Sequence, residues 1–217
     1  MRQVFLKKDG TERLLLFFAG WGMDERPFLD LNPSCDFMVC FDYLSMDFDA
    51  GLVRGYDRID VVAWSMGVFA ASRLDVLDRL AVFSSTAFNG TLYPIDDRKG
   101  IPECVFTGTL RNISPDAMSR FDRRMCNKSS LQIYRQNHPG RTIDSLREEL
   151  FQISQLCKSA CAGNTLSWNH VYIGDSDLII PTANQKAAWQ DYGYNVLKDC
   201  GHYSHDVLKW LIEDGNR

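Results

Sequence analysis

Short apolar runs alternate with longer segments of helical periodicity over most of the chain. Turn-forming residues bound each run, a pattern typical of strands buried on both faces of a parallel sheet. Helical patterns cover residues 66–77, 182–192 and 202–214, and Pro181 immediately precedes the second of these. The predicted strands are 14–20, 36–43, 60–65, 80–85, 170–175 and 194–200. This alternation predicts an α/β fold with a mostly parallel central sheet flanked by helices.

The alternation stops in the segment 93–169. Four prolines interrupt this segment, its strongest patterns are helical and cover residues 114–126 and 142–157, and no strong strand pattern occurs in it. A chain of 217 residues is long enough for one substantial core but short for two ordinary domains. We therefore predict a core formed by residues 1–92 and 170–217, with a small helical cap, residues 93–169, inserted between late strands.

A serine stands where the predicted strand 60–65 meets the next helical pattern. Small residues flank Ser65 at two positions' distance, Ala63 before it and Gly67 after it. In a nucleophile elbow the serine occupies a strained strand-to-helix turn, and such small residues let strand and helix approach closely. Ala63 replaces the more frequent glycine, but the order of strand, turn and helix matches. Ser65 is our candidate nucleophile; the alternative is an ordinary serine helix cap.

A serine nucleophile needs a base to accept its proton and a carboxylate to orient that base. In a fold with this elbow the acid precedes the histidine, each in a loop after a late strand. His202 directly follows the last predicted strand and is preferred over His205, which we expect on the helix. Asp177 and Asp175 compete as the acid, and we favour Asp177 because it lies in the turn before a proline-initiated helix.

The sequence Gly20-Trp21-Gly22 ends the first predicted strand with a tight, glycine-bounded turn. Acyl transfer to serine creates a negatively charged oxygen that two backbone N–H groups stabilise. One donor belongs to the residue after the nucleophile, here Met66, and the other to a loop after an early strand. We expect Met66 and Trp21 to form this oxyanion hole, with the indole beside the acyl pocket. The alternative is a turn whose tryptophan only covers the core.

Charge is distributed unevenly along the chain. The whole sequence has 24 Lys plus Arg and 28 Asp plus Glu, a net charge of −4. Residues 98–147 contain ten basic and four acidic residues, so this segment carries +6 and the remainder −10. The imbalance favours an anionic partner for the basic segment, although a solvated helical face also carries such charges.

Several classes of protein are not indicated by the sequence. There is no apolar signal region and no run of about 18 apolar residues, so we expect a soluble, cytoplasmic protein without membrane contact. The seven cysteines form no CxxC pair, which favours reduced thiols over disulfides or a zinc site. We find no nucleotide loop, metal cluster or nucleic-acid motif and therefore expect no cofactor, no metal and no nucleic acid. We expect a monomer.

The segments FFAGWGMDERPF, AWSMG, GDSDLIIP and CGHYSHD together resemble the α/β-hydrolase superfamily. More narrowly they are similar to the BioG family of pimeloyl-acyl carrier protein methyl ester esterases of biotin synthesis. The resemblance implies that the chain hydrolyses the distal methyl ester of pimeloyl-acyl carrier protein methyl ester to pimeloyl-acyl carrier protein and methanol. By matched position it implies a catalytic triad of Ser65, Asp177 and His202, with Trp21 and Met66 as the oxyanion hole.

The resemblance also implies a role for the basic cap in binding the carrier, because acyl carrier proteins are acidic and present a phosphorylated arm. We expect the cap to steer and hold such a carrier. Arg135 and Arg141 could add to this surface. The candidate carrier-binding residues are Arg111, Arg120, Arg123, Arg124 and Lys128.

Two other functions stay open. The triad could act on a small free ester, a thioester or a C–C bond, or the chain could be a hydrolase-fold binding module without useful turnover.

Overall fold

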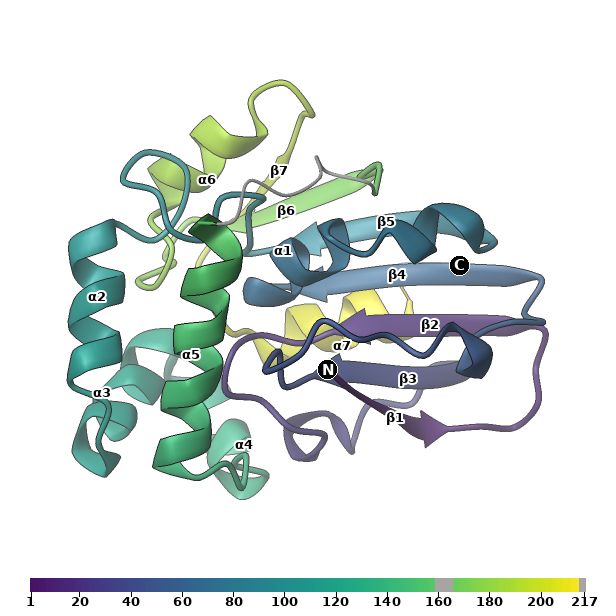
Figure 1. Ribbon diagram of the computed structural model, residues 1–217, viewed down its shortest axis with the longest axis horizontal. Coiled ribbons are helices and arrows are strands. Elements are labelled where there is room, and N and C mark those ends of the chain that lie inside the picture. The colour runs from purple at the N-terminus through teal and green to yellow at the C-terminus, as the bar shows by residue number, and fades with distance from the viewer. Residues whose placement is uncertain (159–165, 215–217) are drawn as a thin grey trace.

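The computed structural model describes residues 1–158 and 166–214. Within these ranges the chain forms a seven-stranded sheet with the order β1-β3-β2-β4-β5-β6-β7 (Figure 1). The edge strand β1 pairs antiparallel with β3, and all other neighbours are parallel. The strands are β1 Arg2–Lys7, β2 Arg13–Phe18, β3 Asp36–Phe41, β4 Arg58–Trp64, β5 Val82–Phe88, β6 His170–Gly174 and β7 Asn195–Leu197. The predicted mostly parallel sheet flanked by helices is confirmed.

Helices cover both faces and one end of this sheet. The helices are α1 Met66–Ser72, α2 Glu103–Arg111, α3 Pro115–Met125, α4 Lys128–Gln136, α5 Ile143–Lys158, α6 Thr182–Trp189 and α7 His205–Glu213. Short 3-10 helices occupy Arg26–Phe28, Ala50–Leu52 and Asp75–Arg79.

The hydrophobic core has two layers because successive side chains of a strand point to opposite faces of the sheet. In β2, Leu15 and Phe17 pack into the layer that includes α7 and the inner side of α5. Leu14 and Leu16 pack into the opposite layer with residues of α1 and α6. Burial on both faces explains why these strands read as continuous apolar runs rather than as alternating patterns.

The three helices predicted in the core are all longer than the observed ones, and α6 ends at Trp189 rather than at residue 192. α1 ends at Ser72 rather than at residue 77, because the backbone at Leu74 is extended and the following 3-10 turn buries Leu77. α7 begins at His205 rather than at residue 202, because the Ser204 side chain caps it by accepting from the Val207 amide. The three residues before this helix therefore lie in a loop.

Four helices, α2 to α5, lie between β5 and β6 in the chain. The carboxyl ends of the parallel strands point toward these helices (Figure 1). The sequence patterns predict α3 and α5 in this segment but not α2 or α4. In open α/β sheets, ligands bind outside the carboxyl ends of the strands. The four helices thus cover the end of the sheet where a site is expected.

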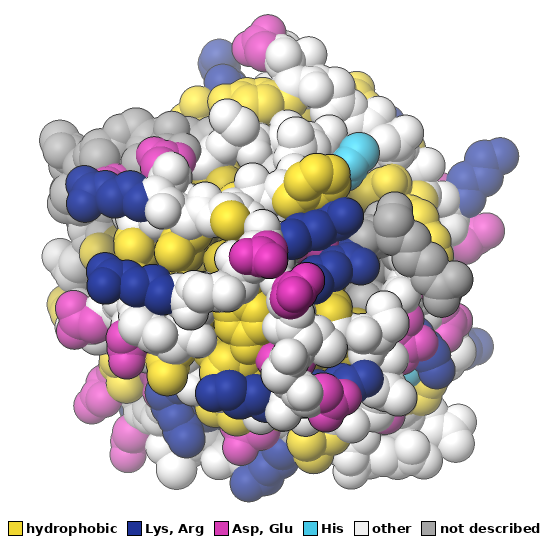
Figure 2. Space-filling model, turned by 90° about the vertical axis from the view of Figure 1, so that its right-hand side faces the viewer, with side chains coloured by type: hydrophobic (Ala, Val, Ile, Leu, Met, Phe, Trp, Pro, Cys, Tyr) yellow, Lys and Arg dark blue, Asp and Glu magenta, His cyan; other side chains and the backbone are white. Residues whose placement is uncertain are grey.

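Figure 2 shows the opposite end of the molecule, at the amino ends of the parallel strands. Basic, acidic and apolar side chains are interspersed on this face, so charge does not single it out for an anionic partner. In the described ranges, no helix is long and apolar enough to cross a membrane.

Candidate active site

Ser65 occupies the sharp turn between β4 and α1. Its backbone has φ 57° and ψ −125°, an uncommon conformation for a residue with a side chain. A Cβ at Gly67 would lie 2.2 Å from the Phe18 carbonyl oxygen, so only glycine lets α1 start this close to β2. The turn places the Ser65 side chain beyond the carboxyl end of the sheet, in the strained arrangement that a nucleophile elbow requires.

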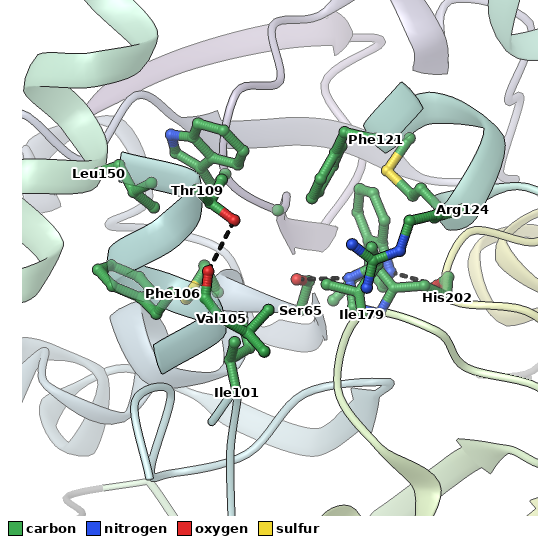
Figure 3. Close-up of a pocket in the computed structure, with 15 residues that line it drawn as sticks. Ser65, Ile101, Val105, Phe106, Thr109, Phe121, Arg124, Leu150, Ile179 and His202 are labelled. Carbon is green, nitrogen blue, oxygen red and sulfur yellow. Dashed lines mark hydrogen bonds between the residues drawn. The ribbon is translucent and has the colours of Figure 1, made fainter. Parts of the chain in front are cut away.

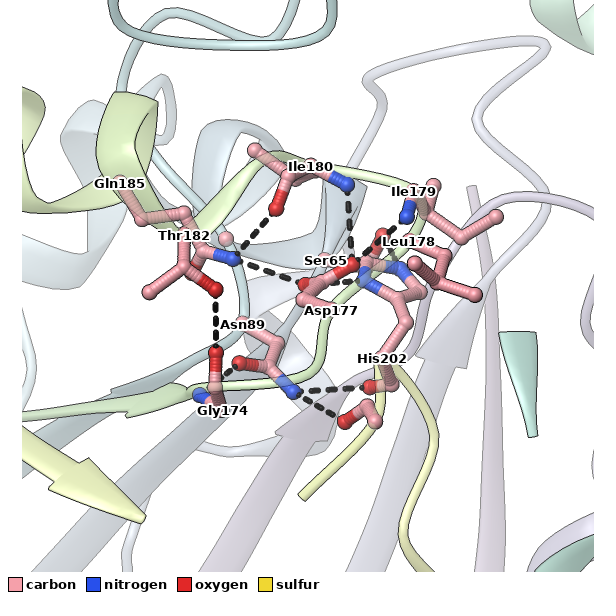
Figure 4. A network of polar contacts seen from close by, with 12 residues as sticks. Ser65, Asn89, Gly174, Asp177, Leu178, Ile179, Ile180, Thr182, Gln185 and His202 are labelled. Atoms are coloured by element: carbon pink, nitrogen blue, oxygen red, sulfur yellow. Dashed lines mark hydrogen bonds and ion pairs between the residues drawn. The ribbon is translucent and has the colours of Figure 1, made fainter. Parts of the chain in front are cut away.

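The structure brings Ser65, His202 and Asp177 together from three distant parts of the chain. His202 Nε2 lies 2.8 Å from Ser65 Oγ, and His202 Nδ1 lies 2.8 Å from Asp177 Oδ2 (Figure 4). The three residues are buried, with exposed fractions of 6%, 2% and 6% in the order named. This continuous chain of hydrogen bonds allows the imidazole to take a proton from the serine while the carboxylate fixes its tautomer.

Asp177 is held by donors on both carboxylate oxygens. The backbone amides of Ile179 and Ile180 donate to Oδ1 over 2.8 and 2.9 Å. The Gln185 side-chain amide donates to Oδ2 over 2.7 Å, on the same oxygen that faces His202. These bonds fix the carboxylate in the direction of the imidazole. The sequence reasoning did not identify Gln185, whose only signal is its place on the first turns of α6.

The loop that carries His202 is anchored by Asn89 and Trp64. The Asn89 side-chain amide donates to the Gly201 and His202 carbonyls over 2.8 and 3.0 Å, and its oxygen accepts from the Gly174 amide (Figure 4). The Trp64 indole N–H also donates to the His202 carbonyl, over 2.8 Å. One buried side chain thus joins the ends of β5 and β6 to the histidine loop. The sequence reasoning missed Asn89, although an Asn-Gly pair ends its strand.

Asp175 and His205, the competing candidates for the acid and the base, lie outside this chain of hydrogen bonds. Asp175 is exposed and accepts a hydrogen bond from Ser176. His205 is the first residue of α7, as expected, and its Nε2 lies 3.1 Å from Asp30. The geometry therefore favours Asp177 and His202 as the partners of Ser65.

Trp21 and Met66 both border the cavity above Ser65. Met66 is the first residue of α1, so its N–H has no acceptor within the helix. Among the described residues, none accepts a hydrogen bond from the backbone N–H of Trp21. A Cβ at Gly20 would lie 3.2 Å from the Ser65 Cβ, so this loop passes directly beside the serine. Both amides are thus available to an oxygen bound at Ser65.

A largely apolar cavity opens above Ser65 (Figure 3). Phe106 and Leu150 line one side of it, and Ile179, Arg124 and His202 line the other. The full lining is Gly20, Trp21, Trp64, Ser65, Met66, Ile101, Val105, Phe106, Thr109, Phe121, Arg124, Met125, Leu150, Ile179 and His202. This apolar lining around a serine and a histidine suits an aliphatic chain whose reactive end meets the serine.

A second groove, between α2 and α3, shares part of its lining with this cavity. The two share Val105, Thr109, Phe121 and Arg124, and the groove adds Arg120 to its lining. Arg120 and Arg124 are one helical turn apart on α3, and the Arg124 guanidinium donates to the Leu178 carbonyl over 2.8 Å. Basic side chains therefore line the groove, and one of them, Arg124, also lines the cavity above Ser65.

The other candidate carrier-binding residues lie on the surface of the same helices. Arg111 ends α2, Arg123 lies on α3, and Lys128 begins α4; all three are exposed. Arg123 also donates to Ser119 over 2.9 Å, which leaves its charge accessible to solvent. Arg135, near the end of α4, is exposed as well.

Arg141 differs from the expectation that it contributes to a basic surface. Its side chain is 8% exposed and pairs with Asp42 at 3.0 Å and with Glu149 at 3.2 Å. The positive charge is therefore neutralised inside the protein. A sequence count of basic residues cannot distinguish such an internal cation from a surface one.

The cysteines near the site do not compete with Ser65 as nucleophiles. Burial raises the pKa of the Cys200 thiol to about 11 and that of Cys126 to about 12. Both thiols are therefore neutral at physiological pH, and the neutral thiol is a poor nucleophile. Every cysteine that the structure describes is a free thiol.

A mostly parallel sheet, a serine on a strained strand-to-helix turn, and an acid and a histidine after later strands define an α/β-hydrolase. Solved structures at low identity share this fold: an esterase from Thermogutta terrifontis is 16% identical with a TM-score of 0.63, covering 99% of this chain and 89% of that one. A model of the family described as pimeloyl-ACP methyl esterase BioG matches residues 1–210, and the chain belongs to this family of esterases.

Two other proteins are more similar to this chain in sequence. The crystal structure of BioG from Haemophilus influenzae is 33% identical with a TM-score of 0.85, covering 95% of this chain and 96% of that one. A protein of Bacteroides fragilis (strain 638R) named malonyl-[acyl-carrier protein] O-methyltransferase is 46% identical over 198 residues, which is 90% of this chain. The chain spans only 40% of the length of that relative.

Proposed function

We propose that this protein is a serine esterase that converts pimeloyl-[acyl-carrier protein] methyl ester to pimeloyl-[acyl-carrier protein] and methanol in biotin biosynthesis. The observation that carries the proposal is the hydrogen-bonded chain Ser65–His202–Asp177 at the base of an apolar cavity. Membership of the pimeloyl-ACP methyl esterase family supports the proposed substrate class.

In the proposed mechanism, Ser65 Oγ attacks the ester carbonyl while its proton passes to His202 Nε2. The carbonyl oxygen becomes an anion that accepts hydrogen bonds from the N–H groups of Trp21 and Met66. His202 then gives the proton to the methoxy oxygen, methanol leaves, and the acyl group stays on Ser65. A water molecule, deprotonated by His202, attacks this acyl-enzyme, and the same proton returns to Ser65 as the carboxylic acid leaves.

The shape and polarity of the cavity and the groove fit a carrier-bound chain. The apolar cavity can enclose the methylene chain, with the distal methyl ester at Ser65. The groove between α2 and α3 can take the arm that joins the acyl chain to its carrier. Arg120 and Arg124 line this groove, so an acidic carrier docked on the cap would meet complementary charge.

The name of the Bacteroides fragilis relative supports the same substrate class. O-methylation of a carrier-bound malonyl group produces a methyl ester, which is the functional group that a methyl esterase hydrolyses. Because this chain spans only part of that relative, the methyltransferase activity is not assigned to it.

The test is hydrolysis of pimeloyl-[acyl-carrier protein] methyl ester, followed by mass spectrometry of the carrier, beside hydrolysis of a small free methyl ester. Ser65→Ala is expected to abolish both reactions. The triple variant Arg120→Ala, Arg123→Ala, Arg124→Ala should lower kcat/KM about tenfold or more for the carrier-bound ester alone, and added salt should shrink this difference.

A matched control removes three exposed positive charges outside the cap. The variant Arg54→Ala, Lys198→Ala, Lys209→Ala changes the net charge equally and should leave the carrier reaction within about twofold of wild type. Equal losses in the two triple variants would show that net charge, not the cap surface, matters. Turnover of the free ester alone would support a general esterase and contradict the carrier-protein substrate.

A further inference from the structure

The loop of residues 19–23, here called the oxyanion loop, is held by the α5 region of the cap. The Trp21 indole N–H donates to the Leu146 carbonyl over 3.0 Å. The Gly22 amide donates to Glu149 Oε2 over 3.3 Å, and the Arg141 guanidinium donates to the Met23 carbonyl over 3.0 Å. Three successive residues of the loop are thus bonded to a short stretch at and just before α5.

Glu149 is the centre of this attachment. Its side chain is fully buried, and its second oxygen, Oε1, accepts from the Tyr43 amide over 3.0 Å. The Tyr43 hydroxyl in turn donates to the Ala19 carbonyl, at the first residue of the oxyanion loop, over 2.6 Å. One carboxylate therefore links α5 to the loop and to the segment after β3, which supports the other end of the same loop.

Hydrogen bonds hold the oxyanion loop at both of its ends and on both sides of the Trp21–Gly22 peptide. The Ala19 amide donates to the Cys40 carbonyl, so the loop begins in a set position. The Gly22 amide fixes the peptide after Trp21, and the Trp21 side chain is fixed separately by Leu146. The Trp21 backbone N–H has no acceptor among the described residues, and it is the group that we expect to donate to the oxyanion.

A purely structural role explains this arrangement poorly. Burial raises the pKa of the Glu149 carboxyl to about 7, which shows that the charged form is costly at this place. Buried ion pairs such as Glu149–Arg141 are often no more stabilising than apolar residues of similar volume. The contacts of Glu149 and Arg141 nevertheless converge on the backbone of one loop beside the candidate nucleophile.

We propose that Glu149 and Arg141 are positioning residues that hold the Trp21 N–H in place for the oxyanion. The proposal rests on the proposed function, since it concerns the second donor of that reaction. Neither residue touches the substrate; both act through the oxyanion loop. The cap therefore carries part of the apparatus that stabilises the transition state, in addition to enclosing the cavity.

The test compares Glu149→Gln with Glu148→Gln, its exposed neighbour on the same helix. Glutamine keeps the shape of glutamate but has one acceptor oxygen, so its NH2 group must face one of the two amides or Arg141. We expect Glu149→Gln to lower kcat about 10- to 100-fold with KM within about twofold of wild type, because the donor acts mainly in the transition state. Glu148→Gln should match wild type.

Labelling of Ser65 by a fluorophosphonate provides a second readout, because that reaction also places a phosphoryl oxygen in the oxyanion hole. Its rate should fall in parallel with kcat in Glu149→Gln. Circular dichroism and thermal unfolding establish that each variant is folded, and Arg141→Met repeats the test from the other side of the ion pair.

The outcomes separate this proposal from the proposed function. Folded variants at Glu149 and Arg141 with wild-type kcat and labelling rates would overturn the positioning role and leave the esterase untouched. Wild-type protein without Ser65-dependent turnover would instead refute the esterase. Loss of folding in both variants would assign the ion pair a structural role and also overturn the proposal.

Discussion

Replacing Gly67 by alanine should test the close approach of α1 to β2 that positions Ser65. The added Cβ would lie 2.2 Å from the Phe18 carbonyl oxygen, 2.6 Å from the Phe18 carbonyl carbon and 2.7 Å from the Ala19 carbonyl oxygen. Optimal contacts between such atoms are about 3.5 Å, so backbone must move by about 1 Å. The partners are backbone atoms of a fully buried strand and its extension, which have no rotamer through which to relax.

We expect Gly67→Ala to lower the free energy of unfolding by about 3 kcal/mol, the upper part of the range for overpacked cores. The helix propensity of alanine would offset only about 1 kcal/mol of the clash. A displacement of about 1 Å at Ser65 and Met66 should also lower kcat about a hundredfold. Urea unfolding followed by tryptophan fluorescence, together with ester hydrolysis, measures both effects.

Gly108→Ala in α2 is the matched control, because a Cβ there meets no atom within 4 Å. This substitution should stabilise the protein by about 0.5–1 kcal/mol through helix propensity alone. A Gly67→Ala variant that loses less than about 1 kcal/mol and keeps full activity would show that α1 does not need this close approach to β2.

Two further substitutions test the site. Asp177→Asn should lower kcat about a thousandfold or more, because an amide at this position can reverse the His202 tautomer. The control Asp175→Asn should keep kcat within about twofold of wild type. Comparable losses of kcat in the two variants would contradict the assignment of Asp177 as the acid. Folding raises the pKa of Glu149 from 4.5 to about 7, so the folded protein binds more protons than the unfolded chain between these values. The Glu149 contribution to the free energy of unfolding should therefore fall by about 3 kcal/mol as pH rises through this window, and Glu149→Gln should lack this fall. Urea unfolding of wild type and Glu149→Gln near pH 5 and near pH 7.5 measures this fall. A difference in free energy of unfolding between the two proteins that is the same at both pH values would contradict the prediction.

The sequence predicts the central strands better than the edges of the fold. β2, β3 and β4 are buried on both faces, and their continuous apolar runs record that burial. β1 is only half buried at the edge of the sheet and shows no such run. The cap helix α2 contains Gly108 and two threonines, which are weak helix formers, so its helical state depends on packing that the sequence does not display.

In the candidate site, too, residues marked by local sequence context are predicted, whereas features that depend on long-range packing are not. Ser65 and His202 are marked by local context, a strand-to-helix turn and the loop after the last strand. The sequence favours Asp177 over Asp175 through its place in the turn before α6, whereas Gln185 and the backbone donors around the carboxylate are visible only in three dimensions. Burial of a charged side chain has no local signature, so Arg141 reads as a surface cation.

Glu149 shows the same limit for a carboxylate. In the sequence it stands beside Glu148 in an ordinary charged helical pattern, yet one side chain is exposed and the other is fully enclosed. Its contacts with Gly22 and Tyr43 join segments more than a hundred residues apart. Such long-range partners are fixed by the fold and leave no trace in residue spacing.

The most direct test of the central claim is hydrolysis of pimeloyl-[acyl-carrier protein] methyl ester in water enriched in the heavy oxygen isotope. The account predicts that Ser65 forms an acyl-enzyme, so the heavy oxygen should appear in the carboxylate of the carrier product and not in methanol, and Ser65→Ala should give no product. Label in methanol, or demethylation that survives in Ser65→Ala, would contradict attack by Ser65 on the ester carbonyl.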